Sequence, residues 1–188
     1  MREDELRDLV QRSSWLIRAL AVVRDSGLPD AWIGAGAIRD LVWGERYGDG
    51  FDPSVRDVDV VFLDPVDLSR DNDDRATERL VAAWPEPLWE AKNQAAVHTW
   101  YPGKFGGGAV APLRTIADAV ATWPEYATAV AVRLDADDHF VVCAPHGLDD
   151  LLDGVWRRNP TRVSPEISRQ RLAHHRPNER WPRVRVMP

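Results

Sequence analysis

This sequence of 188 residues contains only one cysteine, Cys143, and no long apolar run. One cysteine excludes a disulfide within the chain, and its apolar, strand-like surroundings favour inert burial over catalysis. No apolar run approaches the roughly 18 residues of a membrane-spanning helix. The first eight residues are too charged and acidic for a signal peptide. We therefore expect a cytoplasmic protein with a core of its own.

Charge is unevenly distributed along the chain. Residues 154–188 hold nine arginines and two acids, a net charge of +7, which leaves −13 for the rest of a chain whose total is −6. Such a basic tail either folds over an anionic ligand or nucleic acid, or pairs with acids of the body, which is the commoner case. We expect residues 1–188 to form one domain, with 154–188 packed on it as a basic C-terminal tail.

Hydrophobic periodicity predicts helices alternating with strands. The predicted helices cover residues 4–25, 71–84, 93–101, 113–123, 147–152 and 166–175, with another directly after Gly36. The predicted strands cover residues 31–34, 57–63, 88–92, 128–134 and 139–144. Residues 101–111 are rich in glycine and are expected to form a loop that could act as a lid.

Two acids, Asp57 and Asp59, lie in the strand predicted over 57–63. Side chains alternate along a strand, so both carboxylates point to one face. Neighbouring carboxylates repel each other, and a hard divalent cation with oxygen ligands relieves this repulsion. The alternative, a solvent-facing edge strand, fits the surrounding apolar run poorly.

A glycine turn comes just before these acids, in the stretch from Gly34 to Asp40. Gly34 and Gly36 free the backbone for this turn and for close approach of a ligand, and a β-branched side chain at position 36 would block that approach and any positive φ. Backbone N–H groups at the start of the following helix suit a phosphate. Arg39 either contacts that phosphate or, with Asp40, pins the turn structurally. Turn and acids together indicate a metal-assisted reaction on a nucleoside triphosphate.

The turn followed by an Asp-x-Asp strand resembles the nucleotidyltransferase fold of the DNA polymerase beta superfamily, which includes the CCA-adding enzymes. The chain is more similar to a bacterial nucleotidyltransferase-like family whose substrate is unknown. The family's marks in this sequence are Trp89–Ala95, His98, Thr122–Val130, Val132–Leu134, Ala144–Leu151 and Arg158–Pro160. The resemblance implies an α/β (α+β) fold, with a small mixed sheet and flanking helices.

The resemblance also implies a site that uses Mg²⁺ or Mn²⁺. The superfamily places a third acid on the next strand, where Glu90 stands, although Glu90 could instead only pair with Lys92. The expected catalytic and metal-binding residues are Asp57, Asp59 and Glu90, and the expected nucleotide-binding residues are Gly34, Ala35, Gly36, Arg39 and Lys92.

The implied reaction moves a nucleoside monophosphate from a nucleoside triphosphate to an acceptor, which could be a small molecule, a protein or RNA. The chain is too short for the helical RNA-binding domains of CCA-adding enzymes, which disfavours a tRNA end. One alternative is a catalytically silent module that binds nucleotides, and another is a toxin–antitoxin component of the same fold. The presence of both Asp57 and Asp59 favours the enzyme. No membrane partner is expected.

Overall fold

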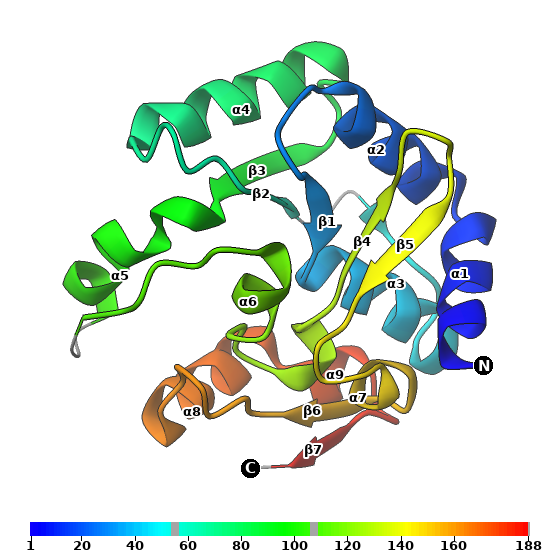
Figure 1. The fold of residues 1–188 in the computed structure, drawn as a ribbon. Coiled ribbons are helices and arrows are strands. Elements are labelled where there is room, and N and C mark those ends of the chain that lie inside the picture. Colours follow the sequence, from blue (N-terminus) through cyan, green and yellow to red (C-terminus); the bar gives the residue numbers. More distant parts are fainter. Residues whose placement is uncertain (54–56, 106–108, 188) are drawn as a thin grey trace.

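The computed structural model describes residues 1–53, 57–105 and 109–187 (Figure 1). Within them, one mixed sheet has the strand order β3-β2-β1-β4-β5. Its strands are β1 (Trp32–Gly34), β2 (Asp57–Phe62), β3 (Leu88–Asn93), β4 (Ala131–Leu134) and β5 (Phe140–Cys143). Strands β2 and β3 run parallel, and the other neighbours run antiparallel. The predicted mixed sheet with flanking helices is therefore confirmed.

The helices lie around this sheet, and several differ from their predicted bounds. They are α1 (Arg2–Arg12), α2 (Ser14–Asp25), α3 (Gly36–Tyr47), α4 (Arg70–Ala83), α5 (Val97–Phe105), α6 (Ile116–Val120), α7 (Asp149–Leu152), α8 (Pro165–His175) and α9 (Pro177–Arg180), with 3-10 turns η2 (Gln94–Ala96) and η3 (Tyr126–Thr128). Among the described residues, no helix has both the length and the apolar character needed to cross a membrane.

Local capping explains two of these differences. The helix predicted over 4–25 is divided because Ser13 has an extended backbone and its hydroxyl accepts the N–H of Leu16, which starts α2. The helix predicted over 113–123 is shorter because Thr115 caps α6 through a reciprocal pair of hydrogen bonds with Asp118. The loop predicted over 101–111 begins late, because α5 continues to Phe105. Its glycines 106–108 lie outside the described residues.

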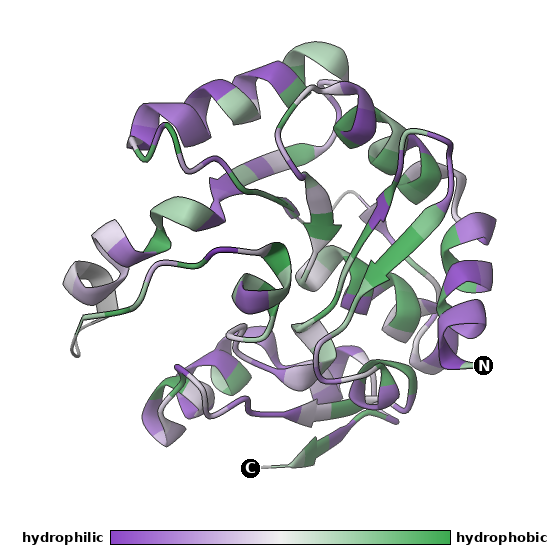
Figure 2. Ribbon diagram, viewed as in Figure 1, coloured by the Kyte–Doolittle hydropathy of each residue, from purple (hydrophilic) through white to green (hydrophobic). Residues whose placement is uncertain are grey.

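The two faces of the sheet have different roles. Alternation along β2 directs Val58, Val60 and Phe62 into the main core, which also contains apolar side chains of α1 to α4. Asp57, Asp59 and Val61 point to the opposite face, where Val61 belongs to a smaller apolar cluster with residues of α6. Figure 2 shows the apolar residues gathered on the central strands and the hydrophilic ones along α1 and α4. The second face is therefore the one that carries the acids.

The C-terminal segment folds against the rest of the chain. It contributes β6 (Val155–Arg157) and β7 (Arg185–Met187), which pair in parallel as a second small sheet below the first in Figure 1. The sequence did not predict these strands, since three residues are too few to show a period. Arginines of the C-terminal segment pair with acids of the preceding residues, in the ion pairs Arg157–Asp150, Arg171–Glu125 and Arg180–Asp40.

Cys143 at the end of β5 is partly buried, and burial raises the pKa of its thiol. A raised pKa keeps the sulfur protonated and poorly nucleophilic. This environment agrees with a structural cysteine.

Candidate active site

The parallel strands β2 and β3 bring Asp59 and Glu90 side by side. The two residues are register partners, just as Asp57 is the partner of Leu88. Neighbouring strands lie about 5 Å apart, and register partners share a face. Asp57, Asp59 and Glu90 therefore converge on the second face of the sheet. Their predicted role as metal ligands remains a prediction.

The electrostatics of this group are unfavourable without a cation. Burial, the charge of Glu90 and then the charge of Asp57 raise the pKa of Asp59 to about 6. A hydrogen bond from the Gly36 N–H and the charge of Arg39 act in the opposite direction but are weaker. Each cause of the raised pKa is relieved when a cation sits beside the carboxylate.

Lys92 follows Glu90 on the same face of β3. Its Nζ lies 3.4 Å from a carboxylate oxygen of Glu90 and 3.9 Å from one of Asp73. The pairing that the sequence left open for Glu90 therefore exists. Both partners are more than 40% exposed at the side chain, so this contact is weak and does not exclude a further ligand on Glu90.

The donor set suits Mg²⁺ or Mn²⁺, because carboxylate oxygens on rigid strands are the ligands that these ions prefer. Asp57, Asp59 and Glu90 would have to draw closer to share one ion. Within the described residues, the group whose ligand atoms all lie within 4.8 Å of one another is Asp135, Asp137 and His139.

That second group occupies the turn between β4 and β5. The carboxylate of Asp135 already accepts the backbone N–H groups of Asp137 and His139, so it shapes the turn. Both Asp137 and His139 are exposed. The carboxylates on β2 and β3 are the better candidates, since Asp59 and Glu90 line a cavity.

The glycine turn has a different geometry from the predicted one. Ala35, and not Gly36, has positive φ, with φ 53° and ψ −121°. Gly36 is the first residue of α3, and a Cβ added there would lie 3.9 Å from Oδ2 of Asp59. A Cβ added to Gly34 would come within 2.5 Å of the Trp123 ring.

Arg39 is 2% exposed. Its Nε and Nη2 donate to Oδ1 of Asp40 at 2.8 and 2.6 Å. Its guanidinium carbon also lies 5.6–5.8 Å from the centres of three indole rings, those of Trp43, Trp156 and Trp181. This burial favours the structural alternative, in which Arg39 and Asp40 pin the turn, over direct contact with a phosphate.

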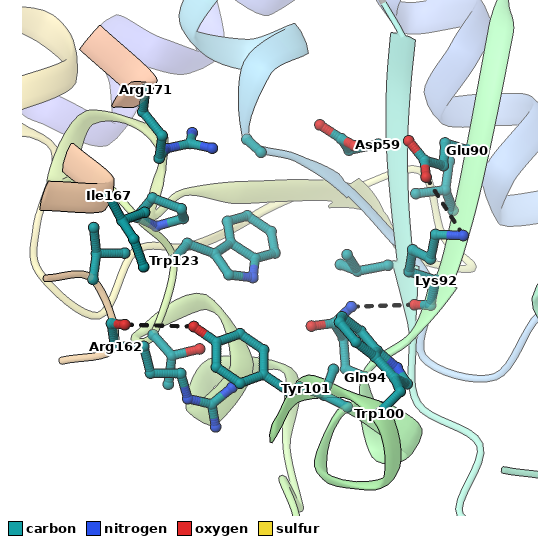
Figure 3. Close-up of a pocket in the computed structure, with 17 residues that line it drawn as sticks. Asp59, Glu90, Lys92, Gln94, Trp100, Tyr101, Trp123, Arg162, Ile167 and Arg171 are labelled. Atoms are coloured by element: carbon teal, nitrogen blue, oxygen red, sulfur yellow. Dashed lines mark hydrogen bonds and ion pairs between the residues drawn. The ribbon is translucent and has the colours of Figure 1, made fainter. Parts of the chain in front are cut away.

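A cavity of about 340 Å³ opens over the second face of the sheet (Figure 3). Asp59, Glu90 and Lys92 line one side of it, and Ala35 of the turn joins them. In Figure 3 the arginines Arg162 and Arg171 of the C-terminal segment lie across the cavity from these acids. The aromatic residues between the two sides are Trp100, Tyr101 and Trp123.

Arg162 and Arg171 are held in different ways. Arg162 lies over the ring of Tyr101 at 5.2 Å, and the Tyr101 hydroxyl donates to its backbone carbonyl at 3.4 Å. Burial lowers the pKa of Arg162. Arg171 instead donates twice to Glu125, at 2.6 and 3.0 Å, and this carboxylate is almost fully buried. The cavity therefore has a cationic side that belongs entirely to the tail.

Asn159 ties the tail to the aromatic wall. It is completely buried, and its Nδ2 donates to the carbonyls of Ala121 and Trp123 at 2.7 and 2.9 Å. Its Oδ1 accepts from the backbone and the hydroxyl of Thr161, next to Arg162. The amide of Asn159 thus holds the backbone beside Trp123 and the backbone beside Arg162 in place.

Sequence reasoning missed five of these cavity residues, namely Trp100, Tyr101, Trp123, Arg162 and Arg171. Two signals pointed towards them. Trp123 stands within a stretch that resembles the family, and the arginine excess of the tail included an anionic ligand among its explanations. Neither signal identified a single side chain.

Comparisons with known proteins identify the family and the fold. A family model described as nucleotidyltransferase matches residues 21–186. A structure solved by NMR and described as revealing a CCA-adding enzyme head domain is 28% identical, with a TM-score of 0.80 over 98% of this chain and 95% of that one. The search of curated proteins gave no match.

Two larger structures share the fold at lower identity. A CCA-adding enzyme in complex with CTP is 16% identical, with a TM-score of 0.62 over 98% of this chain and 43% of that one. The Thermotoga maritima CCA-adding enzyme in complex with tRNA is 14% identical, with a TM-score of 0.61 over 97% of this chain and 42% of that one. The chain thus spans less than half the length of either enzyme.

Proposed function

The chain belongs to the nucleotidyltransferase family, and from this premise we propose that it uses Mg²⁺ to transfer a nucleoside monophosphate from a nucleoside triphosphate to an acceptor. Family membership and the fold account for nucleotidyl transfer in general terms. The observation that carries the rest is that Asp57, Asp59 and Glu90 share one face of the sheet, where Asp59 and Glu90 line a cavity with aromatic walls.

Asp57, Asp59 and Glu90 are the residues that would hold the ion. Bound there, Mg²⁺ or Mn²⁺ would neutralise phosphate charge and polarise the acceptor hydroxyl. The raised pKa of Asp59 supports this assignment, because a desolvated carboxylate beside two other acids is costly until a cation joins it. The hydrogen-bonded strands β2 and β3 would keep the carboxylates in place during the reaction.

The nucleotide would lie along the cavity. Ala35 lines it at the start of α3, where the helix N-terminus attracts phosphate. Lys92 adds a positive charge on the same side. Trp123 and Tyr101 offer ring faces to the base. A structure of the same fold is described as a complex with CTP, which supports a nucleotide as the substrate.

The transfer step follows from these positions. The acceptor oxygen attacks the α-phosphorus, and a new P–O bond forms. The bond from the α-phosphorus to the bridging oxygen of the β-phosphate breaks, and pyrophosphate leaves with the electron pair. The acceptor's proton passes to the carboxylate of Glu90, whose side chain is 49% exposed and can return the proton to water.

Calorimetric titration with Mg²⁺ and each nucleoside triphosphate tests the proposal. We expect Asp57→Asn and Asp59→Asn to abolish metal-dependent binding while the fold survives. Asp137→Asn in the turn between β4 and β5 is the matched control and should bind like the wild type. Undiminished binding in both β2 variants would contradict the site.

A transfer assay separates the enzyme from a silent module. The wild type is incubated with a labelled nucleoside triphosphate, Mg²⁺ and a cell extract. Label on any acceptor, lost in Asp59→Asn, supports the enzyme. Metal-dependent binding without transfer would indicate the module that only binds nucleotides.

A further inference from the structure

A second cavity, of about 450 Å³, adjoins the first along β3. It lies between the start of α4 and helix α5. The two cavities share the side chains of Glu90, Lys92 and Trp100. A molecule in either cavity therefore reaches Glu90, and molecules in both would meet beside it.

The lining of the second cavity is polar and has balanced charge. Its charged side chains are two cations, Arg70 and Lys92, and two acids, Asp73 and Glu90. Lys92 lies near both acids, so its positive charge is already partly neutralised by them. Ser69 and Thr99 also line the cavity, and the Thr99 hydroxyl donates to the carbonyl of Ala96 at 2.7 Å. These groups offer donors and acceptors to a ligand without an excess of positive charge.

The segment that forms one rim of the cavity is acidic overall, and four of its residues, Leu68, Ser69, Arg70 and Asp73, line the cavity itself. Residues 64–75, which lead into α4 and form its first turns, contain five aspartates and two arginines. Each phosphate of a nucleic acid carries a negative charge, and RNA-binding surfaces neutralise it with an excess of Lys and Arg. This rim has the opposite sign. It disfavours a polyanion and attracts a neutral or positively charged molecule.

Trp100 forms the apolar side of the cavity. Its side chain belongs to α5 and is 38% exposed, which is unusual for so large a ring. Trp100 also contacts Tyr101, with ring centroids 6.0 Å apart. The exposed part of an indole ring binds C–H surfaces of a ligand ring, and it also attracts an ammonium group. Carboxylates and an indole face around one space suit a compound that carries hydroxyl groups, with or without an amine.

We propose that the second cavity binds the acceptor, and that this acceptor is a neutral or positively charged small molecule with hydroxyl groups. The proposal rests on the proposed function, since Glu90 joins the two cavities. The nucleotide occupies the first cavity, and a hydroxyl reaches Glu90 from the second. The new P–O bond then forms at the α-phosphorus, pyrophosphate leaves with the bonding electrons, and Glu90 takes the hydroxyl proton.

The test uses the full chain with a labelled nucleoside triphosphate, Mg²⁺ and three fractions of a cell extract. These are total RNA, anionic dialysable metabolites, and neutral and cationic dialysable metabolites. We expect label in the last fraction. Thr99→Phe narrows the second cavity from α5 and should lower this transfer by about tenfold, with unchanged nucleotide affinity.

Two further variants keep the test decisive. Ser69→Phe narrows the same cavity from α4 and should act in the same direction if Thr99→Phe folds poorly. Val81→Phe is the matched control, because Val81 is exposed on α4 and lines neither cavity. It should transfer label like the wild type.

Label that appears in RNA or in the anionic fraction overturns the proposal, and so does full transfer by folded Thr99→Phe and Ser69→Phe. Metal-dependent nucleotide binding with no label in the neutral and cationic fraction overturns the acceptor assignment alone. Absence of that binding in the wild type contradicts the proposed function itself.

Discussion

The backbone of Gly34 lies against the indole of Trp123, so closely that a Cβ on Gly34 would be 2.5 Å from ring atom Cη2. Gly34 is in β1, whereas Trp123 follows α6 and forms a wall of the first cavity. The sequence assigned Gly34 to a phosphate cradle. In the structure, its missing side chain makes room for the aromatic wall.

We expect Gly34→Ala to lower the free energy of unfolding by about 1–3 kcal/mol, because the added carbon must displace the ring of Trp123. The matched control is Gly36→Ala, whose Cβ would lie 3.8 Å from Arg39 and 3.9 Å from Asp59, in ordinary contact. Urea denaturation measures both variants. Equal stability of the two would show that Trp123 moves without cost.

Ala35 has a backbone conformation, with φ 53° and ψ −121°, that favours glycine. We expect Ala35→Gly to raise the free energy of unfolding by about 1 kcal/mol, because it removes local strain. Ala37→Gly, two residues later inside α3, should instead lower it by about 1 kcal/mol. Thermal unfolding compares them, and a loss of stability in Ala35→Gly would contradict strain at this position.

The raised pKa of Asp59 predicts a pH-dependent stability. Its folded-state pKa of about 6 exceeds the ordinary value of 3.8, so the native state holds the proton more tightly than the unfolded state. Stability is then highest below pH 3.8 and falls as pH rises to about 6. Asp59→Asn should be more stable than the wild type at pH 8, by about 1–3 kcal/mol.

Denaturation of both proteins at several pH values, without divalent metal, checks this prediction. The advantage of Asp59→Asn should shrink between pH 6 and pH 4, where the wild-type carboxyl becomes protonated. A difference that stays constant over this range would mean that Asp59 is not destabilised by its surroundings.

Arg171 holds α8 to the body through the buried carboxylate of Glu125. We expect Arg171→Gln to destabilise the protein by about 3 kcal/mol, because it leaves a buried charge without its partner. Arg169→Gln is the control on the same helix. Arg169 pairs with Glu166, and both side chains are more than 60% exposed, so the loss should stay below about 1 kcal/mol.

Thermal unfolding of the two arginine variants gives the comparison. Glu125→Gln should lose less stability than Arg171→Gln, since it removes the buried charge together with the pair. Similar midpoints for Arg171→Gln and Arg169→Gln would indicate that the tail is held by other contacts.

The sequence by itself determined the sheet, most helices and the acidic centre. Alternation places Asp57 and Asp59 on one face of β2 and the valines between and beside them in the core, because adjacent side chains of a strand point in opposite directions. The predicted nucleotidyltransferase family and fold are confirmed. The resemblance to the superfamily, and not alternation, named Glu90, and the parallel register with β2 put it next to Asp59.

Only the tertiary structure decided what surrounds the acids. Trp123, Arg162 and Arg171 reach the cavity through contacts between distant parts of the chain, such as the bonds of Asn159 to the carbonyls of Ala121 and Trp123. Periodicity reports which side of its own element a residue faces, and it carries no information about which distant element will pack there. The sequence did not predict the positive φ of Ala35 for a related reason. The surrounding strands and helix impose a backbone conformation that alanine does not prefer.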